Sequence, residues 1–87
     1  MSKKTVSTTN APSAVGPYAQ AVISGDLIFC SGQIPLDPET GTIAGTSIED
    51  QTTQCLKNLK AVLEAAGSSL QRALKVNIYL TDMKDFS

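Results

Sequence analysis

The sequence predicts an α+β domain in which a small β-sheet carries a helix on one face. Three observations lead to this prediction. Two short apolar segments flank Gly25-Asp26, an apolar stripe of helical period runs between residues 48 and 66, and apolar and polar residues alternate from Ala73 to Asp82. A strand–strand–helix–strand order within 87 residues is typical of one small domain.

The first two segments are expected to form a β-hairpin. Residues 19–24 alternate between apolar and polar side chains, and the run 27–33 begins as a continuous apolar stretch. A Gly-Asp pair between two such runs favours a tight hairpin turn. The polar residues before the hairpin predict at most one short strand, at Lys4–Ser7.

A turn and a helix start are expected between the hairpin and residue 48. The stretch Asp37–Gly41 combines Asp, Pro and Gly, each of which favours a turn for its own conformational reason. Ser47 and Asp50 have the spacing of a capping box, in which each side chain bonds a backbone amide at the helix start.

The helix is predicted from Ile48 to Ala66 and is expected to end at Gly67. Its apolar residues recur at the spacing of a single stripe. Cys55 lies within that stripe, so we interpret it as a core residue rather than a reactive thiol. The stripe comprises Ile48, Cys55, Leu56, Leu59, Val62, Leu63 and Ala66, whereas Gln51, Gln54, Lys57, Asn58, Lys60 and Glu64 are expected mostly on the hydrated side.

The residues after the helix predict one helical turn and one further strand. The turn is expected at residues 68–72, and the strand at 73–82, where period-two alternation would place one face against the helix. Asp85 is positioned to cap a new helix. Because such a small number of elements covers little apolar area, we expect this chain to be either a part of a longer protein or a natural truncation.

Composition argues against several classes of partner. Seven basic and eight acidic residues give a net charge of −1, so nucleic acid is not an expected partner. No apolar run approaches the roughly 20 residues that span a bilayer. The first ten residues lack the apolar centre of a secretion signal. We therefore expect a cytoplasmic protein without membrane contact, while a mitochondrial location stays open despite the lack of a clear transit peptide.

The sequence contains few residues that could bind a metal or act as a nucleophile. The two cysteines, Cys30 and Cys55, are expected to be reduced thiols. The absence of histidine leaves almost no zinc ligands and excludes a histidine-dependent catalytic triad. We predict neither a metal nor a cofactor.

The stretch Ile28–Pro35 contains the most informative local pattern. An apolar run stops at Ser31-Gly32, and Pro35 interrupts regular strand pairing. Glycine at a strand end lets a ligand or another backbone approach the main chain. The simpler interpretation, a strand that runs out into a loop, stays open on local pattern alone.

Three separated blocks resemble the RidA/YjgF/UK114 family of enamine and imine deaminases. They are Gly16-Pro17-Tyr18-Ala19-Gln20-Ala21, Ser31-Gly32-Gln33-Ile34-Pro35 and Lys75–Met83, and they occur in the family's order between about Asn10 and the last residue. The resemblance implies that residues 1–87 form a single RidA-like domain with a chorismate-mutase-like fold, a mixed sheet with helices on one face. It also implies that this chain stops before the second helix and the last strands.

The resemblance implies hydrolysis of 2-iminobutanoate or 2-iminopropanoate to a 2-keto acid and ammonia. An arginine of the family holds the substrate carboxylate and a glutamate serves the proton transfers; neither matching position occurs here, so no catalytic residue is predicted in this chain and its own activity is in question. Arg72 does not correspond to that arginine, nor Cys30 to the family's cysteine.

The substrate-binding residues implied by the resemblance are Tyr18, Ser31 and Gly32. From the residues alone, Tyr18 is equally well a half-buried structural tyrosine, and Gly32 can be a glycine that only ends a strand; the family match favours the pocket for Gly32. The family forms homotrimers with pockets between subunits. Asn77 and Tyr79 are candidates for a subunit contact, although a solvated strand face is the simpler expectation.

Two alternatives to the deaminase remain open at this point. One is a non-enzymatic trimer that binds ligands or acts like a chaperone. The other is an RNA-directed inhibitor of translation, a theme among family members that the near-neutral charge supports poorly.

Overall fold

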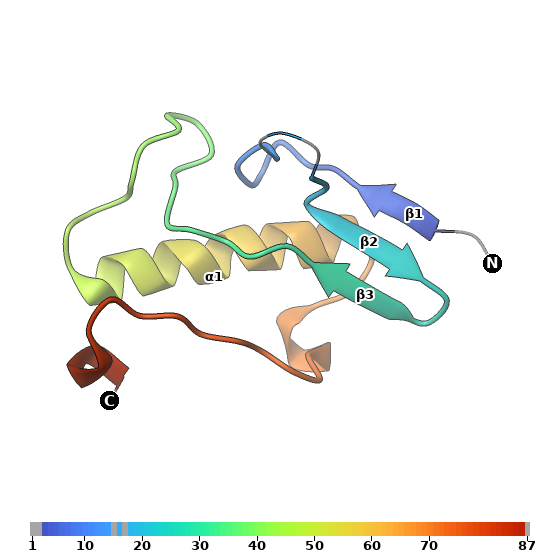
Figure 1. Ribbon diagram of the computed structural model, residues 1–87. Helices are drawn as coiled ribbons and strands as arrows, with labels where there is room; N and C mark the ends of the chain where they lie inside the picture. The colour runs from blue at the N-terminus through green and yellow to red at the C-terminus, as the bar shows by residue number, and fades with distance from the viewer. Residues whose placement is uncertain (1–2, 15, 17, 87) are drawn as a thin grey trace.

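The computed structural model describes residues 3–14, 16 and 18–86, and Figure 1 shows a small antiparallel sheet with one long helix across it. The strands are β1 (Lys3–Val6), β2 (Ala21–Ser24) and β3 (Leu27–Cys30). The helix α1 spans Ile48–Ala65, and two short 3-10 helices follow at Leu70–Arg72 and Met83–Phe86. The α+β prediction is confirmed.

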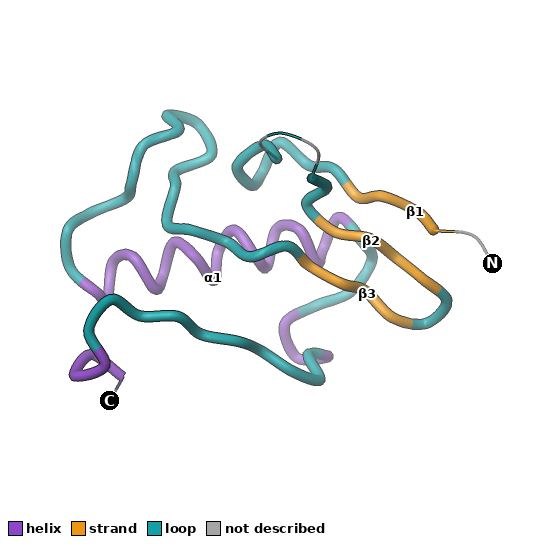
Figure 2. Tube along the Cα trace, in the orientation of Figure 1, coloured by secondary structure: helices purple, strands orange, loops and turns teal. Residues whose placement is uncertain are grey.

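The sheet has the order β1-β2-β3, and both pairs are antiparallel. In the β2–β3 hairpin, Ala21 pairs with Cys30 and Ser24 pairs with Leu27, so Gly25-Asp26 forms the predicted turn. The first strand is the short one expected, one residue earlier than predicted. β3 ends at Cys30, three residues before the predicted end, and Figure 2 shows the chain continuing from it as a loop.

The core lies between one face of the sheet and α1. Register places Ala21 opposite Cys30 and Ile23 opposite Ile28, so these four side chains share a face. Val62, which is fully buried, belongs to the same cluster from the helix side. The buried members are Val6, Ala11, Ala21 and Val62, with Ile23, Ile28, Cys30, Ala61 and Ala66 packed against them.

The ends of α1 follow local signals in the sequence. Ser47 accepts a hydrogen bond from the amide of Asp50 at 3.1 Å, which is the first half of the predicted capping box. At the other end, the amides of Gly67 and Ser68 bond back to the carbonyls of Glu64 and Leu63. Such 5→2 and 6→1 bonds are typical of a helix end at glycine, as predicted.

The loop between β3 and α1 contains the predicted turn. Asp37 accepts hydrogen bonds from the amides of Glu39 and Thr40, and its own amide bonds to Thr42. An isolated bridge pairs Leu36 with Ile43 just outside this turn. The loop therefore has its own short hairpin-like closure.

The prediction of a strand at 73–82 is wrong for this structure. Figure 2 shows the segment as an irregular stretch between the two 3-10 helices. Leu74, Val76, Ile78 and Tyr79 are between 56% and 89% exposed. The alternation has the pattern of a strand, but a strand forms only when a neighbouring strand supplies its hydrogen bonds, and the described sheet ends at β3.

The second 3-10 helix begins after Asp82, whose Oδ1 accepts from the amide of Lys84 at 2.9 Å. A helix capped by Asp85 would start after that residue, so this expectation stays a prediction. One smaller prediction is wrong. Asn58, expected mostly on the hydrated side of α1, is completely buried. Its amide finds backbone partners in the loop after β3, which removes the cost of taking it out of water.

None of the helices in the described part of the chain is long and apolar enough to cross a bilayer.

Candidate functional site

Ser31 extends the β2–β3 ladder one step beyond the two strands. Its amide donates to the carbonyl of Gln20 at 3.0 Å, and its hydroxyl donates to the carbonyl of Ala19 at 2.5 Å. Ser31 is thus bonded to the two residues that directly follow Tyr18. The structure brings the first two sequence blocks of the predicted site together.

Gln20 holds the chain that leads into Tyr18. Its side chain is buried, and its amide nitrogen donates to the carbonyls of Thr8 (3.0 Å), Ala11 (3.4 Å) and Pro12 (2.8 Å). Its side-chain oxygen, Oε1, accepts from the backbone amide of Thr8 at 2.6 Å. A buried amide with its partners satisfied is a rigid connection, so the loop 8–12 is fixed to the start of β2.

Tyr18 lies at the surface with 72% of its area exposed. This exposure contradicts the interpretation of Tyr18 as a half-buried structural residue. A Cβ added at Gly16 would lie 3.9 Å from two carbons of the Tyr18 ring, so ring and backbone are neighbours there. Pro17, between them in the sequence motif, lies outside the described residues.

Gly32 is exposed, and a Cβ added there would meet no described atom within 4 Å. Its backbone does not lie in the left-handed region, so backbone strain does not require glycine at this position. Gly32 therefore presents an open backbone next to Ser31.

The chemistry available at these residues is that of hydrogen bonding. Because a carbonyl oxygen cannot donate, the single hydroxyl proton of Ser31 is committed to Ala19. The lone pairs of Ser31 Oγ are then suited to accept from a ligand N–H or from water. The Tyr18 phenol can donate or accept, and its ring adds an apolar wall. Tyr18, Ser31 and Gly32 include no cation for a substrate carboxylate.

Sequence reasoning missed two residues of α1 that contact the loop after Gly32. Asn58 donates to the carbonyls of Ile34 (3.1 Å) and Leu36 (2.9 Å), and Cys55 Sγ donates to the carbonyl of Gln33 (3.4 Å). The signal was present, because position 58 lies three residues after Cys55 and four before Val62, on the buried stripe. A polar residue on such a stripe is expected to be buried and to bond to polar groups of another segment.

Both cysteines are half-buried thiols. Burial raises the pKa of Cys30 and of Cys55 above the ordinary value of 9.0, because a buried thiolate loses hydration. The protonated thiol is therefore the form present at neutral pH, and neither sulfur is an activated nucleophile. Cys55 is not part of the core cluster between the sheet and α1; its half-buried thiol contacts the carbonyl of Gln33 instead.

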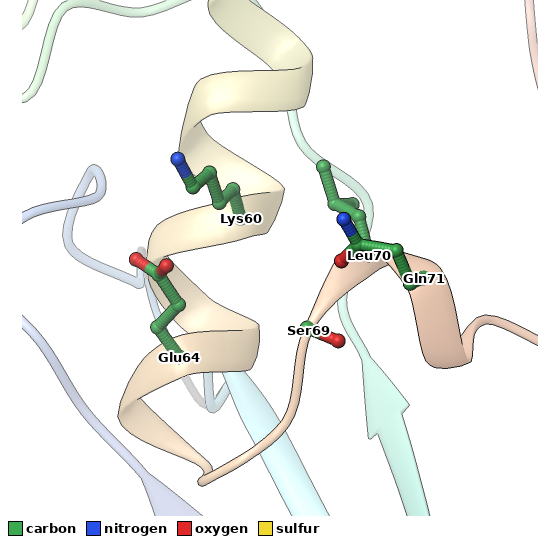
Figure 3. Close-up of a pocket in the computed structure, with 5 residues that line it drawn as sticks. All are labelled: Lys60, Glu64, Ser69, Leu70 and Gln71. Carbon is green, nitrogen blue, oxygen red and sulfur yellow. The ribbon is translucent and has the colours of Figure 1, made fainter.

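A depression of about 200 Å³ lies between α1 and the first 3-10 helix, and Figure 3 shows the residues that line it. Its lining residues include none of the predicted site residues. They are Lys60, Glu64, Ser69, Leu70 and Gln71. A second, apolar depression of about 280 Å³ is lined by Val76, Ile78, Leu80, Met83 and Phe86. Neither depression combines a carboxylate-binding group with Ser31.

Among the described residues, no three acidic, cysteine or histidine side chains come close enough to hold a metal ion.

Comparison with known proteins settles the family. The model of the family described as endoribonuclease L-PSP matches residues 8–87. The chain belongs to this family. A RutC family protein of Pyrococcus horikoshii is 53% identical over 85 residues, which covers 98% of this chain and 68% of that protein. The RidA/YjgF/UK114 resemblance of the three sequence blocks is thereby confirmed.

Another member of the endoribonuclease L-PSP family gives a chemical name. The 2-iminobutanoate/2-iminopropanoate deaminase of Salmonella typhimurium is 44% identical over 84 residues, covering 97% of this chain and 65% of that protein.

Solved structures of the family agree with the fold. A Thermotoga maritima protein provisionally named an endoribonuclease superposes with a TM-score of 0.93 at 51% identity, over 95% of this chain and 65% of that one. TdcF of Escherichia coli with bound serine gives a TM-score of 0.90 at 43% identity, over 95% and 65%. This chain thus spans about two thirds of the length of its relatives.

Proposed function

We propose that this chain supplies the substrate-cradling part of a deaminase that hydrolyses reactive 2-imino acids, such as 2-iminobutanoate and 2-iminopropanoate, to 2-keto acids and ammonia. The observation that carries the proposal is that Ser31, which precedes Gly32, is hydrogen-bonded to Ala19 and Gln20, the two residues that follow Tyr18. The name of the Salmonella relative supports the substrate class.

The reaction needs little from this part of the site. Water adds across the C=N bond, its oxygen to carbon and one proton to nitrogen; the second water proton then moves from that oxygen to nitrogen as the C–N bond breaks, so the products are the keto oxygen and ammonia. Ser31 Oγ accepts a hydrogen bond from the imine N–H or from that water, and Gly32 leaves room for the ligand at the backbone. The Tyr18 ring bounds the substrate and its hydroxyl orients it.

The groups that hold the carboxylate and transfer protons come from outside these 87 residues. A carboxylate is best held by an arginine, whose planar donors match its two oxygens. We assign that role, and the acid–base role of a glutamate, to the third of the relatives' length that has no counterpart here. TdcF with bound serine supports an amino-acid-like ligand, since serine also carries nitrogen and carboxylate on one carbon.

The full protein is proposed to be a cytoplasmic homotrimer with its pockets between subunits, and to need no cofactor. The exposure of Tyr18 and Gly32 supports pockets between subunits, because a ligand bound there would be enclosed only when other protein covers these residues.

A deaminase assay on the full-length protein tests the proposal. The imine is generated in situ by a pyridoxal-phosphate dehydratase, and formation of 2-ketobutanoate is followed with and without the protein. We expect a faster rate with the wild type, and roughly tenfold lower kcat/KM for Ser31→Ala, which corresponds to one lost hydrogen bond. Thr52→Ala, on the exposed surface of α1, is the matched control and should keep the wild-type rate. A well-folded full-length protein that leaves the imine's spontaneous decay unchanged would refute the deaminase.

The family description favours RNA cleavage as a second candidate. A ribonuclease needs a cationic surface for the phosphates and an acid–base pair, and the net charge of −1 and the lack of histidine weaken this candidate. Incubation of the same protein with a labelled single-stranded RNA, at several salt concentrations, distinguishes the two. Salt-sensitive cleavage without imine hydrolysis would replace the deaminase by the ribonuclease.

A further inference from the structure

Asn58 is a fully buried polar residue in the middle of α1, and every hydrogen-bonding group of its side chain is used. The two bonds from Nδ2 reach Ile34 and Leu36, and Oδ1 accepts from Gln54 Nε2 at 2.8 Å. The Asn58 side chain is therefore fixed in one orientation.

The segment from Ser31 to Ile34 is held by hydrogen bonds rather than by apolar packing. Ser31, Gly32 and Ile34 are exposed, with Ile34 at 59%, so apolar packing contributes little to their position. The ordinary strand pairing of β3 has already ended at Cys30. The segment is thus fixed by the two bonds of Ser31 at its start and, after Gly32, by backbone carbonyls between Gln33 and Leu36.

Two residues on the same side of α1 bind three of these carbonyls. Cys55 contacts Gln33, and Asn58, three residues further along the helix, contacts Ile34 and Leu36. The Asn58 bonds are the stronger ones, because amide donors bond better than a thiol. Rigid α1 therefore sets where the loop after Gly32 begins.

Gly32 lies between two anchors. On one side, Ser31 is bonded to Ala19 and Gln20; on the other, Asn58 holds Ile34 and Leu36. A glycine with no side chain and no packed neighbour has many backbone conformations when free. Held at both sides, it presents its peptide groups in one arrangement, which is what a preorganised site requires.

We propose that Asn58 is a positioning residue of the substrate site, which acts through the carbonyls of Ile34 and Leu36 to keep Gly32 and Ser31 in the geometry that binds the ligand. The proposal rests on the proposed function for the identity of the ligand. The positioning itself is independent of the reaction and is measured separately.

The substitution Asn58→Asp isolates this role. Aspartate has almost the same shape but, ionised, only accepts hydrogen bonds, so it cannot bond the two carbonyls and repels them. Val62→Ala is the matched control, because Val62 is equally buried one turn later and does not belong to the loop contacts. Both variants lose global stability, and only Asn58→Asp removes the loop anchor.

The experiment uses the full-length protein at a temperature where both variants are folded. Amide hydrogen exchange is measured at Leu36, Asp37 and Ala44, whose amides are bonded within the loop. Deaminase KM and kcat are measured alongside, together with the affinity for 2-ketobutanoate, the reaction product. For Asn58→Asp we expect at least tenfold faster exchange at these three amides, KM and the product dissociation constant raised about tenfold, and a smaller change in kcat. Val62→Ala should leave all of these near wild type.

Equal loop exchange and equal KM in the two variants would overturn the positioning role. If the wild type shows no deaminase activity, the proposed function fails, while exchange at Leu36 and binding of 2-ketobutanoate still decide the role of Asn58. If Asn58→Asp does not fold, Gln54→Leu serves instead, because it removes only the bond that orients the Asn58 amide. It should speed exchange at Leu36 severalfold, and unchanged exchange there would count against the proposal.

Discussion

Ser31 and Gln20 are joined by a backbone hydrogen bond of 3.0 Å, and the side chain of the same Gln20 binds the carbonyls of Thr8 and Pro12. One residue therefore connects the end of the β2–β3 hairpin with the loop that leads toward Tyr18. The backbone of Gln20 thus fixes Ser31, and its buried side chain fixes the loop before Tyr18.

Replacement of Gln20 by leucine should destabilise the protein. The change leaves the carbonyls of Thr8 and Pro12 without their buried donor, which costs about 1–3 kcal/mol in the free energy of unfolding. Urea denaturation measures the loss. Gln51→Leu, at a half-buried glutamine on α1, is the control and should stay within about 0.5 kcal/mol. Equal effects of the two substitutions would mean that the Gln20 contacts contribute no net stability.

The N-terminal cap of α1 gives a second prediction. Ser47→Ala removes the oxygen that accepts from the amide of Asp50, and we expect unfolding to become easier by about 1 kcal/mol. Ser47→Asp keeps an acceptor and should recover most of that loss. Thermal unfolding followed by circular dichroism measures both, with exposed Thr46→Ala as the neutral neighbour.

The elements that the sequence predicted well are those defined by neighbours in the chain. The turn at Gly25-Asp26, the cap at Ser47 and the end of α1 at Gly67 depend on residues a few positions apart. The strand at 73–82 has an equally clear local pattern, but a strand also needs a partner that its own residues do not specify. Local periodicity predicts that a segment can pair, and not that it does.

The residues of the candidate site also fall into those that the sequence indicated and those that depend on distant contacts. Motif resemblance indicated Tyr18, Ser31 and Gly32, and the structure places Ser31 beside the residues that follow Tyr18. A polar Asn58 on the apolar stripe indicates that it needs partners, but these partners are carbonyls more than 20 residues away, and a carbonyl has the same chemistry in every residue. Which carbonyls Asn58 binds follows from the path of the loop and not from residue type.

Gly45 and Gly41 form a natural pair for testing backbone strain against crowding. Both have positive φ, +73° and +72°. A Cβ at Gly45 would lie 2.6 Å from the Cβ of Asp50, whereas at Gly41 it would meet nothing within 4 Å. Gly41→Ala should cost about 1–2 kcal/mol from strain alone. Gly45→Ala should cost about 1–3 kcal/mol more, because Asp50 and the start of α1 must move. Equal losses in urea denaturation would show that Asp50 moves aside freely.

Stability should fall at alkaline pH through the two thiols. Their pKa values are raised in the folded protein, so the folded state holds its thiol protons more tightly than the unfolded state. This contribution is complete below the ordinary thiol pKa of 9.0 and is lost as pH rises through the higher folded values. Urea midpoints should therefore be flat from pH 7 to 8 and decline above pH 9. The double variant Cys30→Ser/Cys55→Ser should decline less over that range, and an identical decline would assign the effect to other groups.

Ile78 distinguishes the conformation of segment 73–82 seen here from the strand that its alternation predicts. In this 87-residue structure Ile78 is 73% exposed, so Ile78→Ser should change the free energy of unfolding by less than about 0.5 kcal/mol. The buried control, Val62→Ala, should cost several times more. In a chain of the relatives' full length, the same Ile78→Ser should cost about 2 kcal/mol or more if pairing buries the apolar face. Paired urea denaturations of the two lengths measure this. A small loss in both would show that the alternation of 73–82 is not used for strand pairing, and a large loss in both would show that Ile78 is already buried in the 87-residue chain.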